Sequence, residues 1–180
     1  MSIPNAFEYR PGMAADALCV GALATQVFLD TYATEGIGSD LAREAFKNYS
    51  PEAVLARLAD PDTFFILSER QAHLVGFAEM SRNRPCPVAA VGYRFELVRL
   101  YVQRRFQRQV LGRTLTLQAE ALARREAAAG VWLAAWSGND RALAFYSALQ
   151  YENVGTTEYV FEGRAYENML FVKVLPVSTT

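Results

Sequence analysis

The stretch that decides the fold runs from Phe95 to Leu149. It reads FELVRLYV (95–102), QRRFQRQVLGRTLTLQAEALARREAAAG (103–130), VWLAAW (131–136) and SGNDRALAFYSAL (137–149). The first and third pieces are apolar strands, and the third is apolar throughout, as expected of a central strand. The second is a turn followed by a long helix, and the fourth begins a shorter helix. This order predicts an α/β or α+β fold with a mixed sheet.

The rest of the sequence predicts elements on both sides of this stretch. Ser50-Pro51 is a helix start, with Ser as N-cap and Pro at the first helical position. We see no linker or repeat, and we expect one domain over 1–180. The other predicted elements are a short strand at 7–10, a helix at 13–32, a polar connection at 34–40, a helix ending near 60, a hairpin of strands at 63–67 and 74–80, a loop at 83–92, and closing strands at 154–161 and 165–174.

Composition limits the function classes. The 180 residues are 52% apolar and 21% charged, and 18 Lys and Arg nearly balance 19 Asp and Glu, for a net charge of -1. A soluble globular protein has this composition, and no basic field argues for nucleic acid. Cys19 and Cys86 fit no metal-binding spacing, so we expect free thiols and no metal. We see no signal peptide and no apolar run near the roughly 20 residues that span a bilayer, so we expect no membrane partner and a cytoplasmic location.

The turn before the long helix carries a candidate phosphate site. Phosphates bind backbone N–H groups at a helix N-terminus, where four donors lack intrahelical partners and the helix dipole is positive. Gln107 to Gly112 lies where the strand ends and the helix begins, and the glycine allows close approach to the backbone. Arg108 and Arg113 add positive charge. An ordinary loop with a solvated basic face is the alternative.

With these residues, the central stretch resembles the GNAT superfamily of N-acetyltransferases. The family motif is Gln/Arg-x-x-Gly-x-Gly/Ala after a strand, and the chain matches it at Gln107 and Gly112 but has Val110 at the first glycine. The resemblance implies acetyl-CoA as cosubstrate and a twisted mixed sheet of six to seven strands with a splayed parallel pair. The cofactor-binding residues it implies are Leu100, Tyr101 and Val102 on the strand, and Gln107, Arg108, Gln109, Val110, Leu111, Gly112, Arg113 and Thr114 at the turn.

The chemistry of acetyl transfer to an amine needs a base and an acid. An amine with a pKa near about 10.4 is protonated at neutral pH and must lose a proton before it attacks. On the family pattern Tyr146 is the general acid, and the alternative is a core aromatic residue. Glu96 is the candidate base, directly or through water, and the alternative is a salt-bridged strand carboxylate; Glu79 is second choice. Asn139 contacts the cofactor, caps the following helix, or does both. His73 is expected to be an exposed turn residue.

The resemblance extends to bacterial polyamine (spermidine/spermine) N-acetyltransferases of the PaiA type. It implies a small-molecule amine as acceptor, and the family commonly forms homodimers. Asp30, Tyr32 and Glu35 are candidate acceptor contacts, and the alternative for each is a solvated helix or loop residue. Two other functions stay open at this point. The chain could be a CoA-binding sensor without catalysis, or it could acetylate a protein or peptide amine.

Overall fold

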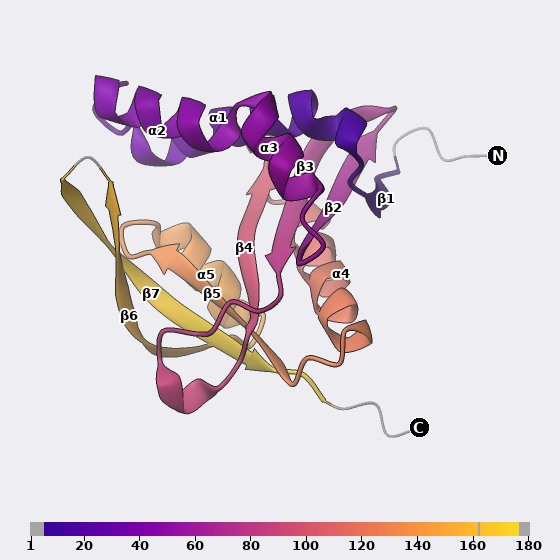
Figure 1. Cartoon of the computed structure of the whole chain (residues 1–180), viewed down its shortest axis with the longest axis vertical. Coiled ribbons are helices and arrows are strands. Elements are labelled where there is room, and N and C mark those ends of the chain that lie inside the picture. The colour runs from indigo at the N-terminus through magenta and orange to yellow at the C-terminus, as the bar shows by residue number, and fades with distance from the viewer. Residues whose placement is uncertain (1–5, 162, 177–180) are drawn as a thin grey trace. The chain divides into compact units, whose positions relative to one another are not determined.

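The computed structural model describes residues 6–161 and 163–176, apart from the side chain of residue 161. It contains a mixed sheet with strand order β1-β2-β3-β4-β5-β7-β6, and helices accompany it (Figure 1). This confirms the predicted fold class. The strands are β1 Glu8–Pro11, β2 Thr63–Arg70, β3 His73–Ser81, β4 Phe95–Val102, β5 Gly130–Trp136, β6 Glu152–Phe161 and β7 Arg164–Val174. The α-helices are α1 Ala17–Tyr32, α2 Ser39–Tyr49, α3 Pro51–Leu58, α4 Leu111–Arg125 and α5 Asp140–Ala148, and the 3-10 turns are η1 Ala14–Asp16, η2 Ala89–Val91 and η3 Arg104–Phe106.

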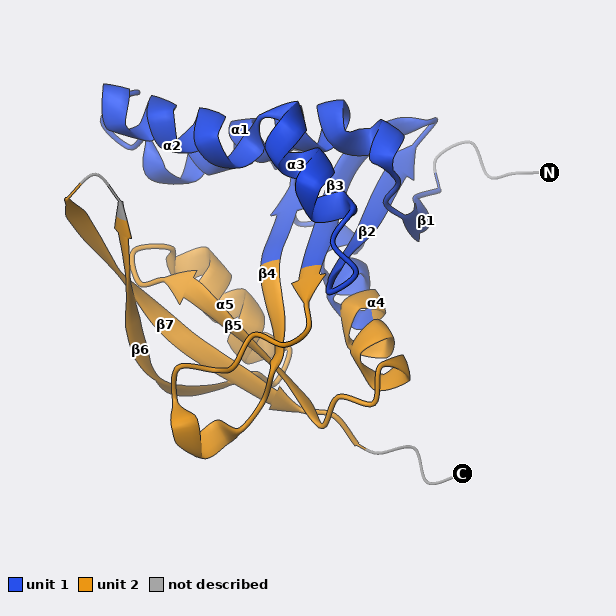
Figure 2. Ribbon diagram, in the orientation of Figure 1, with its two compact units in different colours: residues 1–79, 99–117 blue, residues 80–98, 118–180 orange. Residues whose placement is uncertain are grey.

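The chain divides into two compact units, coloured separately in Figure 2. Unit 1 comprises residues 1–79 and 99–117, and unit 2 comprises residues 80–98 and 118–180. Both β4 and α4 contribute residues to each unit. The predicted single domain over 1–180 stays a prediction.

Unit 1 is built around helix α1, which packs against both α2 and α3. Its core side includes Val20, Ala24 and Phe28, which are spaced by four residues on one helix face and are buried. Gly21 lets α2 approach closely, because a Cβ at this position would collide with the main-chain oxygen of Tyr49. Apolar burial of this kind contributes most of the stability of such a layer.

Helix α2 was missed by the sequence analysis, which had a polar connection at 34–40 and assigned nothing to the residues before Ser50. The helix spans Ser39–Tyr49. Its buried residues Leu41, Ala45 and Tyr49 are spaced by four, which places them on one face. The polar residues around Gly38 are therefore the start of a helix and not only a connection. The predicted start of α3 is confirmed, because the Ser50 side chain accepts a hydrogen bond from the Ala53 amide at 3.2 Å.

The hairpin between β2 and β3 turns at Gln71 and Ala72. Both residues have left-handed backbone angles, with φ of 51° and 58°. Two consecutive residues with positive φ make a type I′ turn, whose twist matches that of the strands it joins. His73 follows directly and is exposed, as predicted.

Unit 2 is centred on an antiparallel ladder of β5, β7 and β6, in which Trp132 pairs with Val172. Cys86, Trp132, Leu170 and Val172 form a buried cluster. The Trp132 indole donates a hydrogen bond to the Arg84 carbonyl at 2.8 Å, and the ring packs within this cluster. Both cysteines are free, as the sequence analysis expected.

The expectation that no apolar run approaches the length of a membrane span needs a correction for one helical segment. Residues 14–32 are long and apolar enough to cross a membrane by length and composition, with mean hydropathy 1.2. The core helix of a globular protein passes the same test, and several side chains of α1 are buried within unit 1.

Candidate functional site

The turn before α4 supplies a row of available backbone donors. Within residues 6–161 and 163–176, the amides from Arg108 to Arg113 donate to no acceptor in the chain. They are flanked by two amides already in use: Gln107 donates to the Arg104 carbonyl at 3.2 Å, and Thr114 to the Val110 carbonyl at 2.9 Å. Of the backbone amides that the resemblance implies as donors, those of residues 109–113 are available and that of Thr114 is not. It combines unpaired N–H groups with the positive end of a helix, which is the chemistry of an anion site.

Two side chains define the shape of this turn. The side-chain amide of Gln107 (Nε2) donates to the Val102 carbonyl at 2.9 Å, which holds the turn against the end of β4. Val110 lies outside the left-handed region, and its side chain is 69% exposed. The left-handed residue is Arg108, with φ of 61°. Val110 therefore keeps its amide available, so the turn fits a pyrophosphate despite the departure from the family motif.

Strand β4 begins beside β5 and then leaves it. In unit 2 the parallel ladder joins Phe95 to Val131 and Glu96 to Trp132, and of the described residues there, Leu97 and Val98 pair with none in β5. The parallel strand pair implied by the resemblance is thus present, and its ladder ends after Glu96 within unit 2. A strand edge without ladder bonds can bind an extended ligand through main-chain groups. The predicted cofactor residues Leu100, Tyr101 and Val102 follow in unit 1.

Tyr146 lies on α5 in unit 2 and is buried. Its ring packs on those of Tyr151 and Phe171, with centroids 5.7 and 6.1 Å away. Burial raises the pKa of its hydroxyl above the ordinary value. In the described part of the chain this hydroxyl has no hydrogen-bond partner. It is therefore protonated at neutral pH, and no structural contact occupies the proton that a general acid would give.

Asn139 and Glu96 are also in unit 2. The Asn139 side chain accepts a hydrogen bond from the Ala142 amide at 3.1 Å, so its predicted capping role is confirmed. Glu96 has 12% of its side chain exposed and forms an ion pair with Arg84, at 3.4 Å between Oε2 and Nη1. Most of the Arg84 side chain is in solvent, which weakens this pair. Glu96 therefore forms the salt bridge of one alternative, and it keeps the partial exposure that the other alternative, a base, requires.

Glu79, the second-choice base, has a different environment in unit 1. It is 2% exposed, and its two oxygens lie 3.0 Å from Arg57 Nε and 2.9 Å from Arg99 Nη1. Both oxygens of this carboxylate are therefore engaged by guanidiniums. Arg99 also stacks on the Tyr49 ring, and the hydroxyls of Tyr49 and Tyr101 are 3.1 Å apart. The sequence analysis did not find this cluster; a charged Arg99 inside an apolar strand was the available signal.

The candidate acceptor residues come from the end of α1 and the segment after it. Asp30 and Glu35 are exposed, whereas Tyr32 is half-buried and packs on Phe28 with ring centroids 4.9 Å apart. The structure thus gives Tyr32 a packing partner and leaves the two carboxylates in solvent. In the part of the chain that the structure describes, no group of three or more His, Cys, Asp or Glu could hold a metal ion.

Solved structures with the same fold include two that contain the cofactor. The PaiA N-acetyltransferase of Thermoplasma acidophilum, in complex with coenzyme A, is 20% identical, with a TM-score of 0.77 over 94% of this chain and 99% of that one. A Salmonella typhimurium protein with its cofactor acetyl-CoA is 19% identical, with a TM-score of 0.66 over 98% of each chain.

The sequence comparisons agree with the structural ones. An uncharacterized N-acetyltransferase of Lactobacillus delbrueckii subsp. lactis is 24% identical over 127 residues, which are 71% of this chain and 73% of that protein. The family model described as the acetyltransferase (GNAT) family matches residues 27–151. This match includes the donor row, the splayed strands and Tyr146. The chain belongs to the acetyltransferase (GNAT) family, and it is an acetyltransferase with acetyl-CoA as cosubstrate.

Proposed function

We propose that this protein transfers the acetyl group of acetyl-CoA to the primary amine of a small molecule by direct attack. The observation that carries the proposal is the row of unpaired amides from Arg108 to Arg113 at the start of α4. These donors suit a pyrophosphate because they satisfy its oxygens without desolvating any side-chain charge. Acetyl-CoA supplies the acyl carbon, activated as a thioester.

Each remaining residue in the proposal has one task. The segment of β4 from Leu100 to Val102 binds the extended arm of the cofactor through main-chain groups. Glu96, or a water bound to it, accepts the proton that the ammonium form of the acceptor must lose. Tyr146 gives its proton to the thiolate that leaves, and burial favours its protonated form before that step.

A polyamine is the second candidate acceptor, favoured by the likeness to the PaiA structure. A polyamine carries several positive charges and needs several carboxylates facing one groove. Asp30 and Glu35 are exposed and could serve, but Glu79 is already held by two arginines. We therefore favour a small amine. The cytoplasmic location and a homodimer stay predictions.

The first experiment measures release of free thiol from acetyl-CoA with a panel of amines. The panel contains monoamines, spermidine, amino acids and a short peptide with a free N-terminus. Catalytic turnover with a small amine supports the proposal. Binding of acetyl-CoA without turnover of any amine would favour the sensor, and preferred turnover of the peptide would favour a protein acceptor.

The second experiment tests the donor row with Gly112→Asp. A carboxylate in the first turn of α4 suits the helix dipole but repels a pyrophosphate at the same place. We expect the KM for acetyl-CoA to rise by at least about tenfold, the effect of roughly 1.4 kcal/mol, while the melting temperature is kept. Gln118→Asp places the same charge on an exposed position further along α4 and serves as control. An unchanged KM in Gly112→Asp would contradict the assignment of the cradle.

A further inference from the structure

One cluster of charged side chains in unit 1 contains more positive than negative groups. The cluster of Arg57, Glu79 and Arg99 has two guanidiniums and one carboxylate, and its members come from α3, β3 and β4. Of the residues that the structure describes, Glu79 is the one carboxylate in contact with either guanidinium. The cluster therefore carries one positive charge in excess, within a part of the protein where solvent can screen it only partly.

The two guanidiniums differ in their surroundings. The guanidinium of Arg57 has its pKa lowered by burial and by the nearby charge of Arg99, whereas that of Arg99 has its pKa raised, because attraction to Glu79 and to tyrosine oxygens outweighs its own burial. Arg57 Nε is buried and has no hydrogen-bond acceptor of good geometry within the described residues. Its Nη1 donates to the Asn48 and Ala53 carbonyls at 2.8 and 3.3 Å, which fixes its orientation.

Both arginine side chains keep part of their surface in solvent. The side chains of Arg57 and Arg99 are 23% and 19% exposed. Hydroxyls accompany them, since the Tyr49 and Tyr101 hydroxyl oxygens lie 3.1 Å apart and Arg99 stacks on the Tyr49 ring. Two oriented guanidiniums with adjacent hydroxyls form a donor set that matches a carboxylate, and such charge-assisted hydrogen bonds are the strong ones.

The position of the cluster connects it to the acceptor. Arg99 and Tyr101 flank Leu100 on β4, the segment proposed to hold the acyl donor. Tyr32, a candidate acceptor contact, joins the cluster through rings: it packs on Phe28, which packs on Tyr49 with centroids 5.5 Å apart. An acceptor amine must reach the acyl carbon, so the rest of the acceptor molecule would lie near these groups.

We propose that the Arg57–Glu79–Arg99 cluster, with the hydroxyls of Tyr49 and Tyr101, binds a carboxylate of the acceptor, so that the acceptor is an amine that carries a carboxylate, such as an α-amino acid. This inference rests on the proposed function. A ligand carboxylate makes the cluster neutral overall, whereas a polyamine would bring more positive charge to a site that already has an excess.

The test uses matched amines, each with and without a carboxylate: leucine against isopentylamine, and lysine against cadaverine, with spermidine as a further arm. One charge-assisted hydrogen-bond pair contributes a discrimination of about tenfold to a hundredfold. We expect kcat/KM to be higher by that factor for leucine and lysine. Equal or faster turnover of the amines without a carboxylate, or of spermidine, would overturn the inference.

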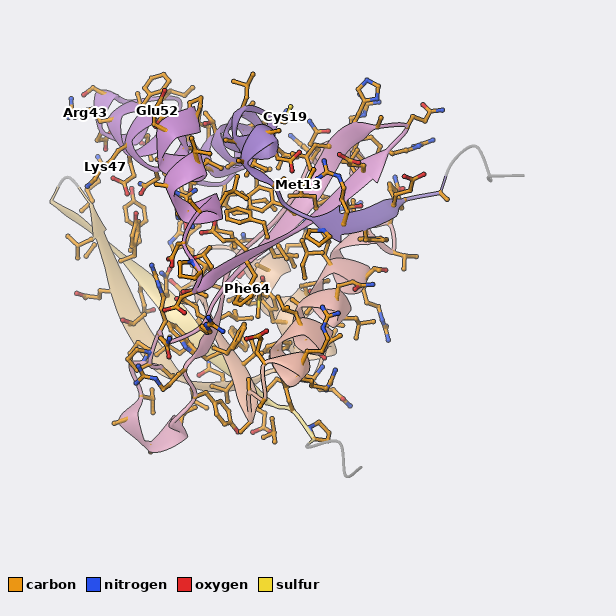
Figure 3. All side chains as sticks on the ribbon, turned by 45° about the vertical axis from the view of Figure 1, so that its right-hand side comes forward. Met13, Cys19, Arg43, Lys47, Glu52 and Phe64 are labelled. Carbon is orange, nitrogen blue, oxygen red and sulfur yellow. The ribbon has the colours of Figure 1, made fainter. Side chains whose placement is uncertain are left out.

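Variants locate the source of the preference. Arg57→Met and Arg99→Met each leave one guanidinium paired with Glu79, so the cluster becomes charge-balanced, and the second variant remains informative if the first does not fold. In each, the preference for the carboxylate should fall to less than about threefold, because the excess charge is gone. Lys47→Met removes one charge from an exposed position on α2 (Figure 3) and should keep the preference. A preference retained in both arginine variants contradicts the assignment.

A binding measurement separates this inference from the proposed reaction. With CoA present, N-acetylleucine should raise the melting temperature, as binding to the folded state requires, and N-isopentylacetamide should not. Stabilisation by N-acetylleucine without turnover of any amine would support the anion site and reject the acetyltransferase. Turnover of leucine that Arg57→Met does not change would support the acetyltransferase and reject the anion site.

Discussion

Replacing Glu79 by Gln tests how unit 1 holds its buried charges. Glu79 is 2% exposed and is the carboxylate that separates Arg57 from Arg99. Removing one partner of a buried ion pair costs about 3 to 5 kcal/mol, because it leaves buried charge without compensation. Here two guanidiniums lose their partner, but each keeps about a fifth of its surface in solvent. We therefore expect the lower end, about 3 kcal/mol of unfolding free energy.

For a chain of this length, about 3 kcal/mol corresponds to a fall in melting temperature of roughly 6 to 12 °C. Thermal unfolding followed by circular dichroism measures it. The control is Glu126→Gln, since Glu126 forms a more exposed ion pair with Arg82 at 2.8 Å, and such pairs contribute about 1 kcal/mol or less. If Glu79→Gln is no less stable than Glu126→Gln, the reasoning fails. If Glu79→Gln keeps its melting temperature but loses orders of magnitude in kcat, Glu79 is the base and Glu96 is not.

Three further outcomes follow from the site. Tyr146→Phe should lower kcat by about tenfold to a hundredfold, with the KM for acetyl-CoA unchanged, since general acid catalysis contributes about that much or more; a wild-type kcat from steady-state thiol release would remove Tyr146 from the mechanism. Because a general acid acts in its protonated form and burial raises the pKa of Tyr146, kcat measured over pH should show no loss from this group below about pH 10; a loss centred near pH 8 that Tyr146→Phe abolishes would contradict the burial argument. Asn139→Ala removes the cap of α5 and should lower the free energy of unfolding by about 1 kcal/mol, a fall in melting temperature of roughly 2 to 4 °C. Asn139→Asp keeps an oxygen that can cap the helix, so it should keep most of this stability.

Local sequence signals predicted those parts of the fold that depend on neighbouring residues. Ser50 and Asn139 cap the helices that follow them, as predicted, because a cap is a hydrogen bond between residues three apart. The strand over 95–102 has its predicted bounds because its apolar run ends at a polar turn. The row of amides was predictable for the same reason, since it arises from the start of α4.

The parts that the sequence did not reveal depend on residues far apart in the chain. The Glu79 site joins α3, β3 and β4, and nothing in the local pattern around Arg57 or Arg99 indicates that the two share one carboxylate. Helix α2 was missed because the segment before it resembles a loop, with glycines at positions 36 and 38. Its apolar face also has few large residues. Only the packing of Tyr49 against α1 makes the role of that face plain.

Val110 shows why the departure from the family motif does not argue against a cofactor. A glycine in a motif is required where the backbone takes a positive φ or where a side chain would block the ligand. In this chain the positive φ falls on Arg108, two residues earlier, and the Val110 side chain is mostly exposed. The positive φ has therefore moved along the turn. Because the proposed binding uses backbone amides, the residue identity at this position can change while the donor row remains.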